Sequence, residues 1–416
     1  MEDLLTIVLL SIALIYIIRC VYAFFFDVKV KIHYIDNRFN NELTKRCPSF
    51  FESYRPNIAM TAIIGVDHLV QTARNGNVVP EKCKTIRLQK IKLDDGGILG
   101  LQWLDADRDI PGTTPIVVSF PPVGYCSAFS GLSGILCHEI NEKLGYRVVQ
   151  VVYQGLGGLP LTSKHLPGTG YCGLSDPGEA VRNVHIAHPN AKILVMGCSI
   201  GSAIFTRWAG ANPQKCKEYQ IIGSLFCAHG FSAQETTERG DTMFMSLGGK
   251  NVVSIWKKQI QENNSDHLKK LDGTNGFSAD ALLAAQLSGR WDEALLPLYG
   301  YKSKSAMFKN CDAANVLRYM NIPALYINAD DDPVCPAARM RRKERPDLLT
   351  HPMAILLGTR RGGHLGWHDG IFASERRWIR NVICQYFRAI VDLDMKHDDS
   401  SLLQLEEISL KERKSE

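Results

Sequence analysis

The chain has 416 residues, of which 45% are hydrophobic and 22% are charged, a balance that suits one large globular domain or two smaller ones. Its formal net charge of +5 is small for this length, and basic and acidic residues are interspersed, so we expect no nucleic-acid partner. The 12 cysteines form no Cys-x-x-Cys pair and no zinc-type spacing, so we expect reduced thiols, no metal and no cofactor.

The first predicted element is an apolar helix over residues 4–26. A helix of this length spans about 35 Å, enough to cross a bilayer with some tilt. The cluster Phe24-Phe25-Phe26 is typical of a membrane interface. A cleaved signal peptide is the alternative, but Glu2 and Asp3 stand where signal peptides are basic. We therefore expect a single-pass membrane anchor, in the endoplasmic reticulum or another endomembrane.

Residues 27–85 form a poorly periodic lead-in, and residues 86–393 read as an α/β domain. Two strands joined by the turn Asp94–Gly97 predict a hairpin at its start. Strands then alternate with helices, which favours a mostly parallel, doubly wound sheet. The expected strands are Ile116–Phe120, Arg147–Tyr153, Ile193–Met196, Tyr219–Phe226, Ala324–Asn328 and Ala354–Gly358, and the expected helices include Ser130–Leu144 and Glu375–Asp392.

Two further segments do not follow this alternation of strands and helices. Residues 230–318 are polar and helical in places, and we interpret them as an inserted helical lid over an active site. The charged tail over residues 394–416 is predicted to be disordered. No internal repeat is present in the sequence.

The stretch Gly197-Cys198-Ser199-Ile200-Gly201 follows an apolar strand and leads into a predicted helix. Strand, sharp turn and helix are the context in which Gly-x-Ser-x-Gly forms a nucleophile elbow. The turn lifts the hydroxyl of Ser199 clear of the sheet, and the glycines leave room where helix and strand approach. We therefore predict Ser199 as a catalytic nucleophile.

A serine hydroxyl needs a base, and the base needs an orienting acid. In a chain with a nucleophile elbow the order is serine, acid, histidine. Asp332 follows the strand over 322–328, and His364 follows the strand over 354–358 between glycines. We predict Asp332 as the acid, with Asp331 as second choice, and His364 as the base in preference to His368.

An oxyanion needs two backbone donors. One is the N–H of Ile200 at the predicted helix start. The other is expected from the loop after Ile116–Phe120, where Pro121 and Pro122 have no N–H, so Val123 is the first candidate.

Taken together, these motifs resemble those of the membrane-anchored α/β-hydrolase-domain proteins. This group has mammalian monoacylglycerol lipase and phospholipase members and yeast medium-chain ethyl ester synthases. The matching pieces are Lys45–Ser49, Asp67–Thr72, Asp95–Gly97, Gly197–Gly201, Trp291–Glu293, Leu298–Tyr301, Asp331–Pro333 and Gly362–Gly366. The resemblance implies the α/β-hydrolase fold and places nucleophile, acid and base at Ser199, Asp332 and His364. The chain departs from the family pattern at Pro121-Pro122, Gln154-Gly155 and Ser202.

Three functions follow as hypotheses. The first is a membrane-bound serine hydrolase that cleaves carboxylic esters of acylglycerols or phospholipids through an acyl-enzyme. The second is an acyltransferase to an alcohol acceptor, which the yeast relatives and the His-x-x-x-x-Asp spacing of His364 and Asp369 suggest. The third is a catalytically dead hydrolase fold that binds a lipid or a protein. The expected partners are a lipid ester and a membrane; orientation and oligomeric state stay open.

Overall fold

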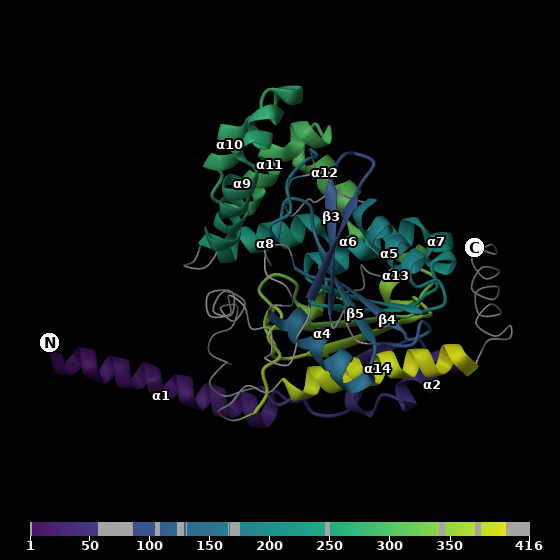
Figure 1. The fold of residues 1–416 in the computed structure, drawn as a ribbon. Helices are drawn as coiled ribbons and strands as arrows, with labels where there is room; N and C mark the ends of the chain where they lie inside the picture. The colour runs from purple at the N-terminus through teal and green to yellow at the C-terminus, as the bar shows by residue number, and fades with distance from the viewer. Residues whose placement is uncertain are drawn as a thin grey trace.

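The computed structural model describes residues 2–56, 86–104, 109–122, 129, 131–164, 166, 175–245, 250–340, 346–370 and 376–396. The motif Asp67–Thr72, the residue Val123 and the tail beyond residue 396 lie outside these ranges. Figure 1 shows a central sheet with helices on both faces and a separate group of helices above it.

Nine strands form one sheet in the order β1-β9-β8-β7-β6-β4-β5-β3-β2. The strands are β1 (Lys31–Tyr34), β2 (Ile86–Lys92), β3 (Ile98–Leu104), β4 (Ile116–Phe120), β5 (Arg147–Val152), β6 (Ile193–Cys198), β7 (Ile221–Cys227), β8 (Ala324–Ala329) and β9 (Ala354–Thr359). From β9 to β5 all neighbours are parallel, whereas β1, β3 and β2 pair antiparallel at the two edges. The α/β-hydrolase fold and its mostly parallel sheet are therefore confirmed.

The central strands are continuous apolar runs because both faces of the sheet are covered. One face packs against α2 (Arg38–Lys45), α4 (Gly131–Leu144) and α14 (Arg377–Lys396). The opposite face packs against α5 (Ser175–Ala187) and α6 (Ile200–Ala211). The remaining short helices near the sheet are η1 (Pro48–Phe50), α7 (Pro213–Glu218), η3 (Ala313–Asn315), η4 (Leu317–Tyr319), η5 (Ala337–Arg339) and α13 (Pro346–Leu349).

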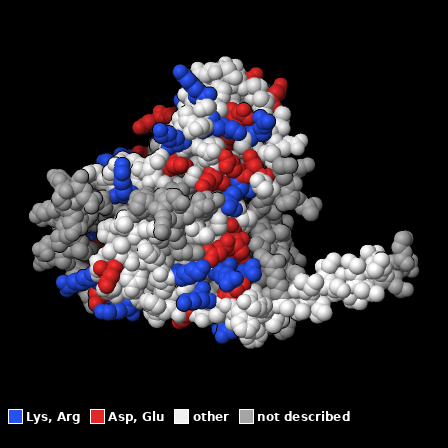
Figure 2. Space-filling model, turned by 180° about the vertical axis from the view of Figure 1, so that it is seen from behind, with Lys and Arg blue, Asp and Glu red and all other residues white. Residues whose placement is uncertain are grey.

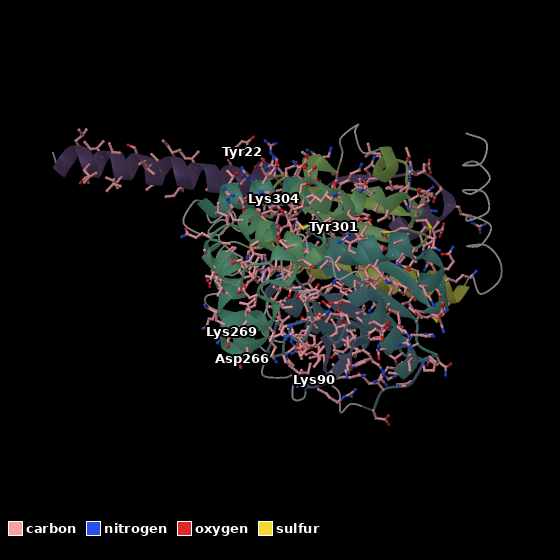
Figure 3. The ribbon with its side chains drawn as sticks, turned by 90° about the horizontal axis from the view of Figure 1, so that it is seen from above. Tyr22, Lys90, Asp266, Lys269, Tyr301 and Lys304 are labelled. Atoms are coloured by element: carbon pink, nitrogen blue, oxygen red, sulfur yellow. The ribbon has the colours of Figure 1, made fainter. Side chains whose placement is uncertain are left out.

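The range 230–318, predicted as a lid, is helical. It holds α8 (Ala233–Met245), α9 (Lys250–Leu271), η2 (Thr274–Gly276), α10 (Ala279–Ala284), α11 (Ser288–Tyr299) and α12 (Lys304–Cys311). Trp256 and Trp291 pack against each other inside it, with ring centroids 5.6 Å apart. The outer surface of α9 carries exposed charges such as Asp266 and Lys269 (Figure 3).

β1 is an element that the sequence did not predict. The four residues Lys31–Tyr34 lie antiparallel beside β9, with Lys31 opposite Gly358 and Tyr34 opposite Ile355. Part of the segment interpreted as a lead-in is therefore an edge strand of the nine-stranded sheet. A strand this short has too few residues to show an alternating pattern.

Helix α1 (Glu2–Phe26) covers the range predicted as a membrane anchor and projects away from the body (Figure 1). Its apolar side chains from Leu4 to Ile18 are exposed where described, whereas Ala23 at its base is buried. Within the described part of the chain, none of the helices has the length and apolar character needed to traverse a membrane. The predicted transmembrane helix is therefore not seen, although a helix does form there.

Candidate active site

Ser199 lies between the end of β6 and the start of α6. Its backbone has φ 52° and ψ −123°, a conformation that costs a non-glycine residue of the order of 1–3 kcal/mol and persists only where the surroundings enforce it. Its N–H donates to the carbonyl of Cys227 on the neighbouring β7, at 2.9 Å. The turn that the sequence predicted is thus present, and it points Ser199 out of the end of the sheet.

Two glycines make this turn possible. A Cβ on Gly197 would lie 2.6 Å from Cα of Ser202, and a Cβ on Gly201 would lie 2.2 Å from the carbonyl oxygen of Phe120 at the end of β4. Contacts this short with backbone atoms do not occur for real Cβ atoms, so both positions require glycine. The close approach of α6 to the ends of β4 and β6 holds the serine in its strained conformation.

Ser202 occupies a position where the family often has another glycine. Its side chain is buried, and its hydroxyl donates to the carbonyl of Ser199. Its own N–H donates to the same carbonyl at 3.0 Å. The departure from the family pattern therefore supplies a second donor that fixes the elbow.

The structure brings Ser199, His364 and Asp332 together. The hydroxyl oxygen of Ser199 lies 2.9 Å from Nε2 of His364, and Nδ1 of His364 lies 3.0 and 3.1 Å from the two carboxylate oxygens of Asp332. A carboxylate accepts but does not donate, so Nδ1 carries the imidazole proton. Nε2 is then an acceptor for the hydroxyl proton of Ser199. The arrangement can generate a serine nucleophile by proton transfer.

Asp332 and Asp331 follow β8 but have different partners. Asp332 is 2% exposed, and its Oδ1 accepts the N–H groups of Val334 and Cys335, both at 2.8 Å. Asp331 instead accepts the N–H of Gly363 at 2.8 Å. Of the two carboxylates, only that of Asp332 has a hydrogen bond to the imidazole within the described residues.

His364 lies in the loop that follows β9. Gly363, Leu365 and Trp367 all have positive φ there, at 58°, 66° and 46°. The loop folds back on Gly362, whose carbonyl accepts the N–H groups of residues 366 and 367 at 3.0 Å. The indole N–H of Trp367 donates to the hydroxyl of Thr359 at the end of β9, at 3.1 Å. A buried aromatic side chain thus closes the loop around the histidine.

His368 and Asp369 lie just beyond this loop and have different partners. His368 Nε2 lies 2.8 Å from the guanidinium of Arg376. Asp369 accepts the N–H of Trp378 at 2.7 Å, in the first turn of α14. The carboxylate of Asp369 therefore stabilises a helix start, which removes the support that the His-x-x-x-x-Asp spacing gave to acyl transfer.

Several known proteins are similar to this chain in sequence or in fold. No family model matches the chain. The mouse protein named phospholipase ABHD3 is 23% identical over 360 residues, covering 85% of this chain and 82% of that protein. The Saccharomyces cerevisiae protein named monoacylglycerol lipase is 24% identical, covering 62% of this chain and 55% of that protein. A solved esterase from Pyrobaculum calidifontis is 13% identical with a TM-score of 0.44, covering 87% of this chain and 94% of that one.

The fold and the similarity to these relatives support an α/β-hydrolase family with lipase and phospholipase members. Its relatives include lipases and phospholipases, and the chain is a serine ester hydrolase. The strand order, the elbow after β6 and the order serine, acid, histidine along the chain agree with this assignment.

In this hydrolase the predicted oxyanion donors are only partly described. Ile200 is the first residue of α6, where N–H groups have no acceptor inside the helix. Val123 lies outside the described residues. Pro121 before it is buried, and its carbonyl accepts the hydroxyl of Tyr153 at 3.0 Å. Pro121 is therefore held by the residue that directly follows β5.

The buried side chain of Cys335 lies close to those of Asp332 and His364, so these three residues are candidate metal ligands. One ligand atom each from Asp332, Cys335 and His364 lies within 4.8 Å of the others. Burial and the nearby carboxylate of Asp332 raise the pKa of the Cys335 thiol well above its ordinary value. Metal ligation by cysteine requires the thiolate, so this set is poorly suited to a metal ion.

The sequence did not predict a hydrogen-bonded network that contains Gln154. Gln154, where the family has an arginine, donates to Asp176 at 2.9 Å and accepts the hydroxyl of Ser163 at 2.6 Å. The carbonyl of Ser163 in turn accepts from His267 of α9 at 2.9 Å. The network connects the loop after β5 to the helices of the 230–318 range. No local sequence pattern predicts such a contact.

Proposed function

We propose that the chain is a lipid ester hydrolase that acts through an acyl-enzyme, with Ser199 as nucleophile, His364 as general base and acid, and Asp332 as the orienting acid. The observation that carries the proposal is the hydrogen-bonded series Ser199, His364, Asp332 at the carboxyl ends of β6, β9 and β8. Carboxylic esters of acylglycerols or phospholipids are the proposed substrates, because relatives are named phospholipase and monoacylglycerol lipase.

The reaction has two halves. His364 takes the proton of Ser199 as the serine oxygen attacks the ester carbonyl, and Asp332 stabilises the resulting imidazolium. The N–H of Ile200, with a second donor predicted at Val123, stabilises the negative oxygen of the tetrahedral intermediate. His364 then gives its proton to the departing alcohol, which leaves an acyl group on Ser199. Water, deprotonated by His364, releases the fatty acid and restores the serine.

The membrane association of the enzyme is part of the proposal. The exposed apolar side chains of α1 support contact with lipid, since large contiguous apolar surfaces are typical of membrane or protein interaction sites. Figure 2 shows the described side chains of α1 without blue or red atoms. Such a helix would keep the active site near substrates that rarely leave a bilayer.

The catalytic assignment is tested with a fluorophosphonate probe and with vesicles that contain monoacylglycerol or phosphatidylcholine. The wild type should be labelled and should release fatty acid, and Ser199→Ala should do neither. Equal labelling of both proteins would refute the assignment. Ethanol or a lysolipid added to the assay separates hydrolysis from acyl transfer, because transfer would yield new esters. Absence of turnover on any ester would favour the non-catalytic hypothesis.

The membrane contact is tested by flotation with phosphatidylcholine vesicles. Leu10→Glu together with Leu14→Glu should reduce the floated fraction, since both side chains are exposed on α1. Ile186→Glu is the matched control, because Ile186 is 59% exposed on α5 and Leu14 is 58% exposed. Equal flotation of all three proteins would contradict the proposed role of α1.

A further inference from the structure

A buried carboxylate lies where α1 joins the body. Asp27 directly follows α1 and is 2% exposed, and its N–H donates to the carbonyl of Ala23 at 3.0 Å. A negative charge is unfavourable at the C-terminal end of a helix, and burial adds a desolvation cost. The helix itself therefore does not explain why an acid occupies this position.

Two arginines from the other end of the chain offset this cost. Nε of Arg361 lies 3.0 Å from one carboxylate oxygen of Asp27, and Nε of Arg360 lies 3.0 Å from the other. Arg361 is largely buried, with a side chain 16% exposed, whereas that of Arg360 is 61% exposed. The Asp27–Arg361 pair is therefore the one shielded from solvent and the one in which a charge deletion costs most.

The contacts continue from Arg361 to the catalytic loop. Nη1 of Arg361 lies 4.0 Å from Oδ2 of Asp331, and Oδ1 of Asp331 accepts the N–H of Gly363 at 2.8 Å. Gly363 directly precedes His364, and Asp331 directly precedes Asp332. A continuous series of polar contacts thus runs from the end of α1 to the residues next to the general base and its acid.

A second set of contacts fixes the same segment. β1 begins at Lys31, whose ammonium lies 3.1 Å from Asp330, and pairs with β9 immediately before the catalytic loop. The N–H of Tyr54 donates to the carbonyl of Val28, and its hydroxyl donates to the carbonyl of His368 at 2.9 Å. The chain on both sides of His364 is therefore held by residues that follow α1.

The catalytic loop needs such external support. Leu365 and Trp367 are non-glycine residues with positive φ, a conformation that persists only when the surrounding structure enforces it. An imidazole displaced by about 1 Å would lower the rate by up to about 10²-fold, since proton transfer requires hydrogen-bond distance.

We propose that Asp27 is a positioning residue for His364, acting through Arg361 and Asp331, so that the junction of α1 with the body holds the histidine loop in its reactive geometry. The inference rests on the proposed catalytic roles and extends them to the N-terminal segment. It implies that the helix proposed to contact lipid and the loop that carries the base share one ion cluster. Figure 3 shows the base of α1, marked by Tyr22, beside the body of the enzyme.

The experiment compares Asp27→Asn with wild type in the full chain, on a soluble p-nitrophenyl butyrate substrate so that lipid contact does not enter the rate. We expect kcat to fall about tenfold with KM within about twofold, because a displaced base slows proton transfer and leaves substrate binding unchanged. Glu42→Gln is the matched control. It removes a carboxylate of the same N-terminal segment that pairs with exposed Lys45 at 3.0 Å, and it should leave kcat unchanged.

A double variant tests the route. If Asp27 acts through Arg361, Asp27→Asn combined with Arg361→Gln should be no slower than Arg361→Gln alone. The proposal would be overturned if the double variant lowered kcat by the product of the two single reductions. An unchanged kcat in Asp27→Asn would also overturn it. If Asp27→Asn fails to fold, Arg361→Lys provides the same test, because it retains the charge but loses the Nε atom that pairs with Asp27. We expect this variant to lower kcat about tenfold.

Amide hydrogen exchange of residues 359–367 separates this inference from the proposed function. Asp27→Asn should increase exchange in this segment, and Glu42→Gln should not. If the wild type turns over the ester and loses turnover in Ser199→Ala while exchange in Asp27→Asn is unchanged, only the positioning role fails. If the wild type shows no turnover but exchange rises in Asp27→Asn, the structural coupling stands and the proposed function fails.

Discussion

The nucleophile elbow and the histidine loop hold their catalytic side chains by different means. The elbow is fixed by shape: Gly197 and Gly201 allow a close backbone approach, and Ser202 bonds the turn from three residues away. The histidine loop is held by polar contacts, through Asp331, which accepts the N–H of Gly363, and through Asp27, which lies 334 positions before its ion-pair partner Arg361. A substitution in the elbow should therefore act sterically and have the same effect at every pH. A substitution in the histidine loop should act through electrostatic interactions.

The largest expected effect is at Asp332, the proposed orienting acid. Asp332→Asn should lower kcat by about 10⁴-fold, because an amide favours the tautomer of His364 that cannot accept the serine proton. Steady-state kinetics on a soluble ester provide the measurement. The adjacent Asp331→Asn, whose carboxylate bonds Gly363 instead, should lose far less activity. Equal losses in the two variants would mean that the roles of these acids are wrongly divided.

Next in size is a steric change in the elbow. Gly201→Ala places a Cβ 2.2 Å from a backbone oxygen of β4, so we expect about 1–3 kcal/mol less stability and about 10²-fold lower kcat at every pH. Urea unfolding and a pH–rate profile measure the two effects. Gly112→Ala is the control, because nothing lies within 4 Å of a Cβ there. A loss of activity in Gly201→Ala that varied with pH would contradict the proposed difference between the elbow and the histidine loop.

The pH dependence of stability tests the histidine loop. Burial raises the pKa of Asp331 to about 6 from its usual 3.8, despite the opposing effects of the Gly363 N–H and Arg361. Between these values the folded protein binds more protons than the unfolded chain, so the stability from this group is lost as the pH rises to about 6. Asp331→Asn, which is always neutral, should therefore gain stability relative to wild type with rising pH, by at most about 3 kcal/mol.

Urea unfolding at about pH 4 and about pH 7.5 measures this difference. A stability difference that is the same at both values would contradict the raised pKa. The Gly201→Ala protein serves as the comparison, since its deficit should not change between the two conditions.

The smallest expected effect is at the edge of the sheet. Lys31→Gln removes an ion pair with Asp330 in which the lysine side chain is 51% exposed, so the free energy of unfolding should change by less than about 0.5 kcal/mol. Thermal unfolding in low salt and high salt checks this. A larger, salt-sensitive loss would show that β1 depends on surface charge rather than on its hydrogen bonds to β9.

Much of the fold could be predicted because its signals are local. The hairpin of β2 and β3 and the central strands lie close to their predicted ranges. β1 was missed because Lys31–Tyr34 is too short to show a period and is defined by its pairing with β9. The transmembrane assignment of residues 4–26 followed from their apolar composition, their length and the aromatic cluster at their end, and no such span is found among the described residues.

Local patterns in the chain predicted the proposed catalytic residues of this hydrolase: a serine between two glycines, then an acid and a histidine, each after a strand. Those signals are readable because parallel strands bring their carboxyl ends to one edge of a sheet. The sequence left Asp331 as a second choice for the acid, and the folded chain shows that Asp332 hydrogen-bonds the imidazole and that Asp27 pairs with Arg361. The side chains of adjacent residues point in different directions, and an ion pair between residues hundreds of positions apart produces no periodic pattern in the sequence. Neither contact can therefore be predicted without the folded chain.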